Sequence, residues 1–171
     1  FNDGTTKVSF FFNTSAAVNP AQASYWASTD PTSSVFYVGT DSAVNGSVSM
    51  TYVGYAWAEI PGYSKFGTYS GNNANDGTYI HLGFRPAWLM VKRIDSTRNF
   101  LIYDGVRSTF NPIQDFLEPD QSTVEQSANA NKVDFVANGF KFRNNSGDMN
   151  GAGTYFYMAI AEQSGDTVFK D

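Results

Sequence analysis

Residues 154–162 read T-Y-F-Y-M-A-I-A-E, and a related stretch, T-Y-V-G-Y-A-W-A-E, occupies residues 51–59. Five of the nine positions are identical. Self-similarity of this kind is typical of a repeated structural unit. Aromatic residues favour the half-buried surface of a strand, so each copy predicts a β-strand. A repeated β-rich unit suits a protein that displays surface, and it is poor evidence for a single catalytic centre.

The repeat predicts three segments. Residues 1–62 would form the C-terminal part of a first repeat, residues 63–163 a second and complete repeat, and residues 164–171 a tail or the start of the next segment. The chain starts with Phe1 and not with methionine. Together with half a repeat at the front, this leads us to expect a processed or trimmed piece of a longer protein.

Composition limits the class of protein. The 171 residues are 42% hydrophobic, which is typical of a globular chain. The formal net charge of −5 argues against nucleic acid or an anionic membrane as a partner, because both need a basic surface. No cysteine is present, so disulfides and thiolate metal sites are excluded. No apolar run approaches the roughly 20 residues of a membrane span. We expect no cofactor.

Short apolar runs bounded by turn residues are the β pattern, and Asn-Gly or Asp-Gly pairs separate several of them. The runs predict strands at Lys7–Phe12, Ser34–Val38, Met50–Glu59, Lys65–Ser70, Thr78–Leu82, Ala87–Arg93, Phe100–Asp104, Lys132–Phe135, Phe140–Arg143 and Thr154–Glu162. The sequence therefore predicts an all-β fold, an antiparallel β-sandwich of jelly-roll or lectin-like type with one short helix.

Three local details refine this fold. Residues 87–93 and 100–104 are expected to form a hairpin. Trp88 and Met90 alternate with Leu89 and Val91, so both faces of that strand should be buried. The helix is expected near residues 111–117, where Asn111 can cap, a proline follows at the first helical position, and apolar residues then share one face.

Few residues suggest catalysis. His81 is the only histidine and lies inside a predicted strand, which favours a structural role. Five carboxylates could in principle hydrolyse a glycosidic bond, but no spacing fixes the separation that this chemistry needs. They are Asp95, Asp104, Asp115, Glu118 and Glu125. Glu59 and Glu162 end the two related strands, where backbone or lysine hydrogen bonds explain them as well as a function does. Residues 71–77 faintly resemble a calcium loop and are interpreted as a plain turn, because expected ligands are missing.

Aromatic residues near predicted turns are compatible with sugar recognition, because their rings stack on the apolar faces of sugars. Packing in the core or at a subunit contact is the alternative for each. The candidate ligand-binding residues are Tyr25, Trp26, Tyr69, Asn72, Asn75, Asp76 and Tyr79. No catalytic, cofactor-binding or metal-binding residue is assigned.

The stretch from Gly54 to Glu162 resembles a repeated domain of marine bacteriophage virion proteins that are often called tail-fibre-like. The residues that carry this resemblance are Y-A-W-A-E-I-P-G-Y-S-K-F-G-T-Y-S-G-N at 55–72, D-G at 76–77, G-F-R-P-A-W-L-M-V-K-R at 83–93, Tyr103-Asp104, Arg107-Ser108, N-G-F at 138–140 and M-N-G-A-G-T-Y at 149–155. The resemblance covers about two thirds of the chain. It implies a β-sandwich exposed on the virion and brings no catalytic residue with it.

This resemblance makes a non-enzymatic phage structural protein the expected function. The chain would belong to a tail fibre or surface appendage that binds host-cell glycan, and it would be assembled in the host cytoplasm. Its partners would be other virion subunits, in a homo-oligomer for which a trimer is one suitable closed assembly. Two alternatives stay open: a capsid decoration or cement protein that binds no sugar, and a glycan depolymerase.

Overall fold

The computed structural model describes residues 9–17, 24–27, 29–127 and 131–162. The chain forms two compact units. One contains Phe1–Phe10 and Val18–Trp57, and the other contains Phe11–Ala17 and Ala58–Asp171. All nine strands of the described residues lie in the second unit, which is therefore the folded β domain.

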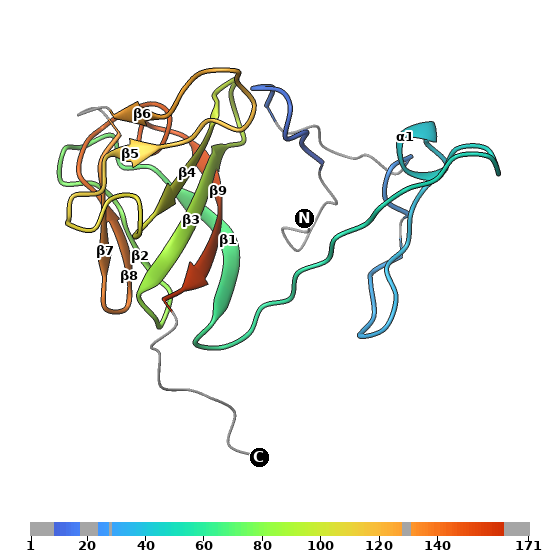
Figure 1. Ribbon diagram of the computed structural model, residues 1–171, viewed down its shortest axis with the longest axis horizontal. Helices are drawn as coiled ribbons and strands as arrows, with labels where there is room; N and C mark the ends of the chain where they lie inside the picture. Colours follow the sequence, from blue (N-terminus) through green and yellow to red (C-terminus); the bar gives the residue numbers. More distant parts are fainter. Residues whose placement is uncertain (1–8, 18–23, 28, 128–130, 163–171) are drawn as a thin grey trace, which may run out of the picture. The chain divides into compact units, whose positions relative to one another are not determined.

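The β domain is an antiparallel β-sandwich built from two main sheets (Figure 1). The first sheet has the order β1-β9-β3-β4, and the second has the order β2-β8-β7. Their bounds are β1 Ser64–Ser70, β2 Tyr79–His81, β3 Pro86–Arg93, β4 Phe100–Asp104, β7 Val133–Val136, β8 Gly139–Phe142 and β9 Thr154–Ala161. A short pair, β5 Asp115–Phe116 with β6 Gln126–Ser127, completes the fold. The predicted fold class is confirmed.

Strand β9 lies inside the first sheet because it pairs with β1 on one side and with β3 on the other. Its alternate residues Tyr155, Tyr157 and Ala159 are buried and face the second sheet. There they meet Phe140 and Phe142 of β8, both fully buried. Burying each large aromatic side chain contributes about 2–3 kcal/mol, so this layer of rings supplies much of the stability.

The hairpin of β3 and β4 is confirmed, with Trp88 opposite Asp104 and Lys92 opposite Phe100. Both faces of β3 are also covered, as predicted. Leu89 and Val91 are fully buried, and Met90 on the other face is only 3% exposed. Gly83 precedes this strand with a φ of 89°, a backbone conformation that favours glycine and turns the chain into β3.

The helix predicted at residues 111–117 is wrong, because this segment is extended. The Asn111 side chain donates to the carbonyl of Phe135 (2.8 Å) and accepts from its N–H (3.0 Å). Ile113 then forms an antiparallel bridge with Val133 and is fully buried. An isolated helix of two turns is marginal in water, whereas pairing with the edge of β7 satisfies the backbone and buries the apolar side chains.

The first unit contains the single helix of the described residues, α1 at Ser42–Asn45. Asp41 caps it by accepting from the N–H of Ala43 at 2.8 Å. The strands predicted at Ser34–Val38 and Met50–Glu59 are wrong, because the described residues there form no ladder. Residues 7 and 8 of the run Lys7–Phe12 lie outside the described part, and residues 10–12 form no strand.

The two related nine-residue stretches therefore differ in structure. Tyr155 is fully buried in β9, whereas Tyr52 is 45% exposed and donates its hydroxyl to the carbonyl of Ser42. A strand needs a partner for its backbone groups, and sequence similarity to β9 does not provide one. That residues 1–62 belong to a first repeat and residues 63–163 to a second stays a prediction, and the predicted tail at residues 164–171 lies outside the described residues. The last boundary between the compact units along the chain lies between Trp57 and Ala58.

The outer side of β1 is an edge of the first sheet. A hairpin begins there, because Ile60 and Ser64 exchange backbone hydrogen bonds, but it extends no further. The Ser64 hydroxyl donates to the carbonyl of Ala58, and Glu59 accepts from the N–H of Phe66 at 3.0 Å. Glu59 therefore takes a backbone hydrogen bond, as one reading of the sequence predicted. Its carboxylate covers one donor of an edge that another strand could otherwise bind.

Gly139 offers a test of how closely β2 and β8 approach. A Cβ at this position would lie 2.0 Å from the carbonyl oxygen of Ile80, whereas a Cβ at Gly105 would have 3.7 Å to its nearest neighbour. We expect Gly139→Ala to lower the free energy of unfolding by about 1–3 kcal/mol, because backbone must move. Gly105→Ala should change it by less than about 0.5 kcal/mol. Urea unfolding of both variants checks this, and equal effects would contradict it.

Candidate functional site

The outer surface of the second sheet brings several polar residues together. Ile80, Phe140 and Phe135 point into the core, so their neighbours along each strand point outward. We call this surface the β2–β8–β7 face and define it by Tyr79, His81, Asp134, Lys141 and Arg143, with the loop 71–77 at its border. Tyr79, Lys141 and Asp134 form one row across the three strands.

Tyr79 and His81 form the aromatic part of this face. The Tyr79 side chain is 46% exposed, and its ring centroid lies 6.4 Å from that of His81. Its hydroxyl lies 3.3 Å from His81 Nδ1 and donates to the carbonyl of Asn138 at 3.2 Å. A Cβ on Gly139 would lie 3.2 Å from Tyr79 Cε2, so the ring rests beside a residue without a side chain. These contacts hold the Tyr79 ring in place, while part of its surface remains exposed to solvent.

Charged groups lie on the same face as this ring. Asp76 forms an ion pair of 2.8 Å with Lys141 and a longer one of 4.0 Å with Arg143, which also binds Asp134. The hydrogen bond from Lys141 and its charge hold the pKa of Asp76 below its usual value, and Arg143 lowers it further. The Asp76 side chain is 82% exposed, so water screens these pairs and each contributes little to stability.

The loop 71–77 is fixed from below by Asn150, which is fully buried. Its Oδ1 accepts from the N–H groups of Asn72 and Thr78, and its Nδ2 donates to Asn72 Oδ1 at 2.8 Å. Its backbone carbonyl accepts from the N–H of Asn73 at 2.8 Å. One buried amide therefore sets the shape of the loop beside Tyr79. No group of acidic or histidine residues in the described chain could hold a metal ion, so we retain the interpretation of this loop as a turn.

The structure brings only some of the predicted sugar-binding residues together. Asn72, Asn75, Asp76 and Tyr79 are exposed on the loop and on β2. Tyr69 is only 8% exposed, stacks on Tyr155 at 5.0 Å and donates its hydroxyl to Met149, so its ring faces the core. Tyr25 and Trp26 are partly buried in the other compact unit.

Sequence reasoning missed the cations of this face. Lys141 and Arg143 are single basic residues on a predicted strand, which is a common arrangement that does not by itself indicate a site. His81 was assigned a structural role, whereas its side chain is exposed beside Tyr79. The alternation of Phe140 and Phe142 with Lys141 and Arg143 is a signal that could have found them, because it places both cations on the solvent side of one strand.

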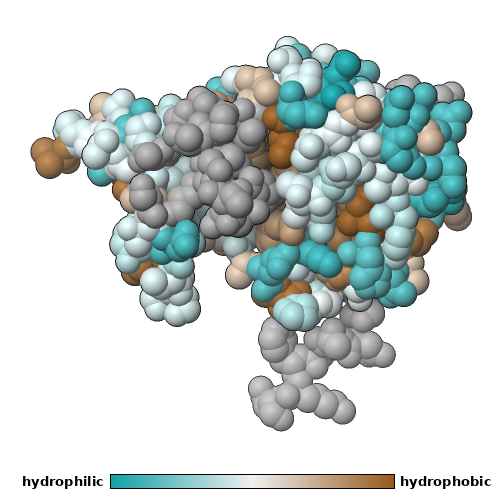
Figure 2. All heavy atoms as spheres, turned by 180° about the vertical axis from the view of Figure 1, so that it is seen from behind, coloured by the Kyte–Doolittle hydropathy of each residue, from teal (hydrophilic) through white to brown (hydrophobic). Residues whose placement is uncertain are grey.

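Hydrophobic surface also occurs away from this face. Val106, Phe110 and Val124 are 86%, 84% and 82% exposed, on the loops that flank β5. On the side of the molecule drawn in Figure 2, hydrophobic areas appear as separate patches among hydrophilic ones. Exposed apolar side chains of this size are candidates for contacts with other proteins.

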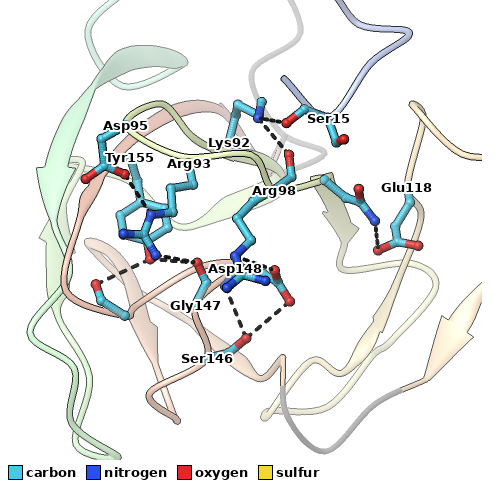
Figure 3. A network of polar contacts seen from close by, with 12 residues as sticks. Ser15, Lys92, Arg93, Asp95, Arg98, Glu118, Ser146, Gly147, Asp148 and Tyr155 are labelled. Atoms are coloured by element: carbon cyan, nitrogen blue, oxygen red, sulfur yellow. Dashed lines mark hydrogen bonds and ion pairs between the residues drawn. The ribbon is translucent and has the colours of Figure 1, made fainter. Parts of the chain in front are cut away.

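The β3–β4 hairpin carries a network of polar contacts (Figure 3). Arg93 donates to Asp95 at 2.7 Å and to the carbonyl of Ala152 at 2.8 Å, and its guanidinium lies 5.7 Å from the Tyr155 ring centroid. Asp95 also accepts from the N–H of Thr154. Burial raises the pKa of Asp95, but the Arg93 and Thr154 hydrogen bonds outweigh it, so the net pKa is lowered. This network ties the hairpin to β9.

Lys92 is the buried cation of the same hairpin. It is fully buried, lies 5.4 Å from the Phe100 ring centroid, and donates to the carbonyls of Ser15 (3.1 Å) and Arg98 (2.7 Å), as Figure 3 shows. Burial lowers the pKa of its amine, and the charge of Asp120 opposes this. Lys92 thereby binds residues 11–17 to the outer face of the first sheet.

The other carboxylates considered for hydrolysis also have partners. Asp104 and Glu125 both bind Arg107, at 2.9 and 2.7 Å. Asp115 accepts from Ser108 at 2.6 Å, which holds its pKa below the usual value. Glu118 accepts from Asn99 at 3.0 Å. Glu162, which follows β9 and is not one of the five candidate carboxylates, binds Arg85 at 2.6 Å. Each of these contacts explains its carboxylate as a structural group.

Comparison with known proteins identifies a family. The family profile described as a domain of unknown function (DUF7483) matches residues 3–164. The chain belongs to this family. No curated protein and no solved structure matches the chain. In the described residues, no helix has the length and hydrophobicity needed to cross a membrane.

The Asp76–Lys141 pair makes a pH prediction. Asp76 should titrate below the ordinary aspartate value of about 3.9. A carboxylate with a lower pKa in the folded state stabilises the fold above its unfolded pKa and loses that contribution as the pH falls through the folded value. The contribution is therefore complete at neutral pH and disappears below about pH 4. Lys141→Met should raise the Asp76 pKa in an NMR titration of the carboxyl carbon; an unchanged value would contradict the assignment.

Asn150 makes a stability prediction. Asn150→Ala leaves several loop amides and carbonyls without their buried partner, at about 1–3 kcal/mol for each group that water does not reach. We expect the free energy of unfolding to fall by about 3 kcal/mol. Hydrogen exchange should rise at the Asn72 and Thr78 amides. Asn75→Ala, on the same loop but exposed, is the control and should change little.

Proposed function

We propose that the protein is a non-catalytic carbohydrate-binding module of a bacteriophage virion, part of a tail fibre or surface appendage that contacts host-cell glycan. The single observation that carries the binding role is the fixed, half-exposed Tyr79 ring beside His81, bordered by the amide side chains of the loop 71–77. Aromatic rings with polar neighbours suit sugars, because sugar rings have apolar faces and hydroxyl edges.

Two further points support this proposal. The virion assignment rests on the sequence resemblance of residues 54–162 to tail-fibre-like proteins. Binding is favoured over hydrolysis because the carboxylates considered for catalysis are engaged by Arg93, Arg107 or neighbouring polar side chains. A general acid needs a raised pKa, whereas Asp95 and Asp115 have lowered ones.

A capsid decoration or cement protein is the second candidate. The observation that favours it is the group of Val106, Phe110 and Val124, each more than 80% exposed. In this case the loops around β5 would contact another virion subunit, and the β2–β8–β7 face would bind no sugar.

A glycan array with the whole chain tests the proposal. We expect binding that Tyr79→Ala weakens about 3- to 10-fold, because stacking on one ring contributes about 0.5–1.5 kcal/mol. Phe110→Ser, which removes a different exposed aromatic residue, is the control and should leave glycan binding unchanged. No binding to any glycan at high protein concentration, together with loss of particle or subunit association in Phe110→Ser, would favour the cement role.

A further inference from the structure

We infer that the ligand of the β2–β8–β7 face is an acidic glycan, a chain of sugars that carries carboxylate or sulfate groups. This inference rests on the proposed carbohydrate-binding function and adds the chemical class of the ligand. It follows from the distribution of charge on the face, which differs from that of the whole protein.

The first observation is an excess of cations on and beside this face. The protein has a net charge of −5. Of the lysines and arginines that the structure describes, only Lys65, Lys92 and Lys132 have no ion pair with a carboxylate, and Lys92 is buried elsewhere. Lys65 and Lys132 both border the β2–β8–β7 face. The ammonium group of Lys65 donates to the carbonyl of His81 at 3.0 Å, and the carbonyl of Lys132 accepts from the N–H of Arg143 at 2.9 Å.

The second observation is that an acidic group already occupies a position on this face. Asp76 reaches the face from the loop, with an 82% exposed side chain, and contacts Lys141 and Arg143 together. Exposed ion pairs are worth about 0–1 kcal/mol, so a ligand carboxylate or sulfate can compete for the same cations. An arginine and a lysine that reach the same position, as here at Asp76, are hydrogen-bond donors that carboxylate and sulfate groups prefer. Asp76 thus marks where an acidic substituent of the ligand would bind.

The third observation is that the cations follow a line. The Lys65 and His81 contact lies at one end of the face, Tyr79 and Lys141 lie in the middle, and Arg143 and Lys132 lie at the other end. Gly139 lies opposite His81, and Arg143 follows it by four residues on the same extended chain. The distance between the two ends of the face is therefore about 13 Å. A line of alternating charge and aromatic surface fits an extended chain with repeated acidic groups better than a single small anion.

The experiment measures binding of the whole chain to dextran, carboxymethyl dextran and dextran sulfate of equal length. We expect binding to the two charged polymers and little to dextran, with weaker binding at about 0.5 M than at about 0.05 M salt because salt screens exposed charges. The double variant Lys65→Gln with Lys132→Gln should lose about tenfold in affinity. Arg85→Gln with Arg98→Gln removes the same charge from outside the face and should lose less than about twofold.

Tyr79→Ala separates specific binding from simple charge attraction, since it keeps every cation. Weaker binding of the charged polymers by this variant supports the inference. Equal binding by the wild type and Tyr79→Ala overturns it, and so does equal binding of polyphosphate or single-stranded DNA. Binding of neutral glycans through Tyr79 without binding of the charged polymers overturns the inference and leaves the proposed function standing. No binding to any glycan overturns the proposed function itself.

Discussion

The stack of Tyr69 on Tyr155 is the contact on which the β domain depends. The rings lie 5.0 Å apart on neighbouring strands, and Phe142 from the opposite sheet packs against Tyr69. Both hydroxyls donate into one loop, to the carbonyls of Met149 and Gly147. Burial raises the pKa of both phenols, so they stay neutral donors. The core thereby positions the loop that carries Asn150, and Asn150 positions the loop beside Tyr79.

Much of this architecture could be predicted from the sequence. Phe100–Asp104 was predicted with its observed bounds, and the other six strands of the two main sheets were predicted within a few residues, because apolar runs between glycine turns are a strong local signal. The segment at 111–117 could not be predicted in this way. Its capping pattern is local, whereas the partner that decides its structure, the edge of β7, lies some twenty residues later.

The candidate site was predicted only in part for a similar reason. Tyr79 and Asp76 were found because they lie near a turn of favourable composition. The same criterion selected Tyr69, which differs from Tyr79 only in facing the core. The sequence around Tyr69, K-F-G-T-Y-S at 65–70, lacks the alternation of apolar and charged residues seen at 140–143, so it does not show which side of the strand faces solvent. The resemblance between residues 51–59 and 154–162 likewise concerns local sequence alone. The surrounding chain decides whether a strand forms.

Glu59 helps to block strand pairing at the free edge of the first sheet. An unpaired sheet edge can pair with a strand of another molecule. The Glu59 carboxylate lies seven residues before Phe66 in the chain and accepts a hydrogen bond from the Phe66 amide at this edge. The protecting carboxylate and the amide that it protects are therefore close together in the sequence. Each copy of the β domain therefore carries this protection within itself, at one of the donors along its edge.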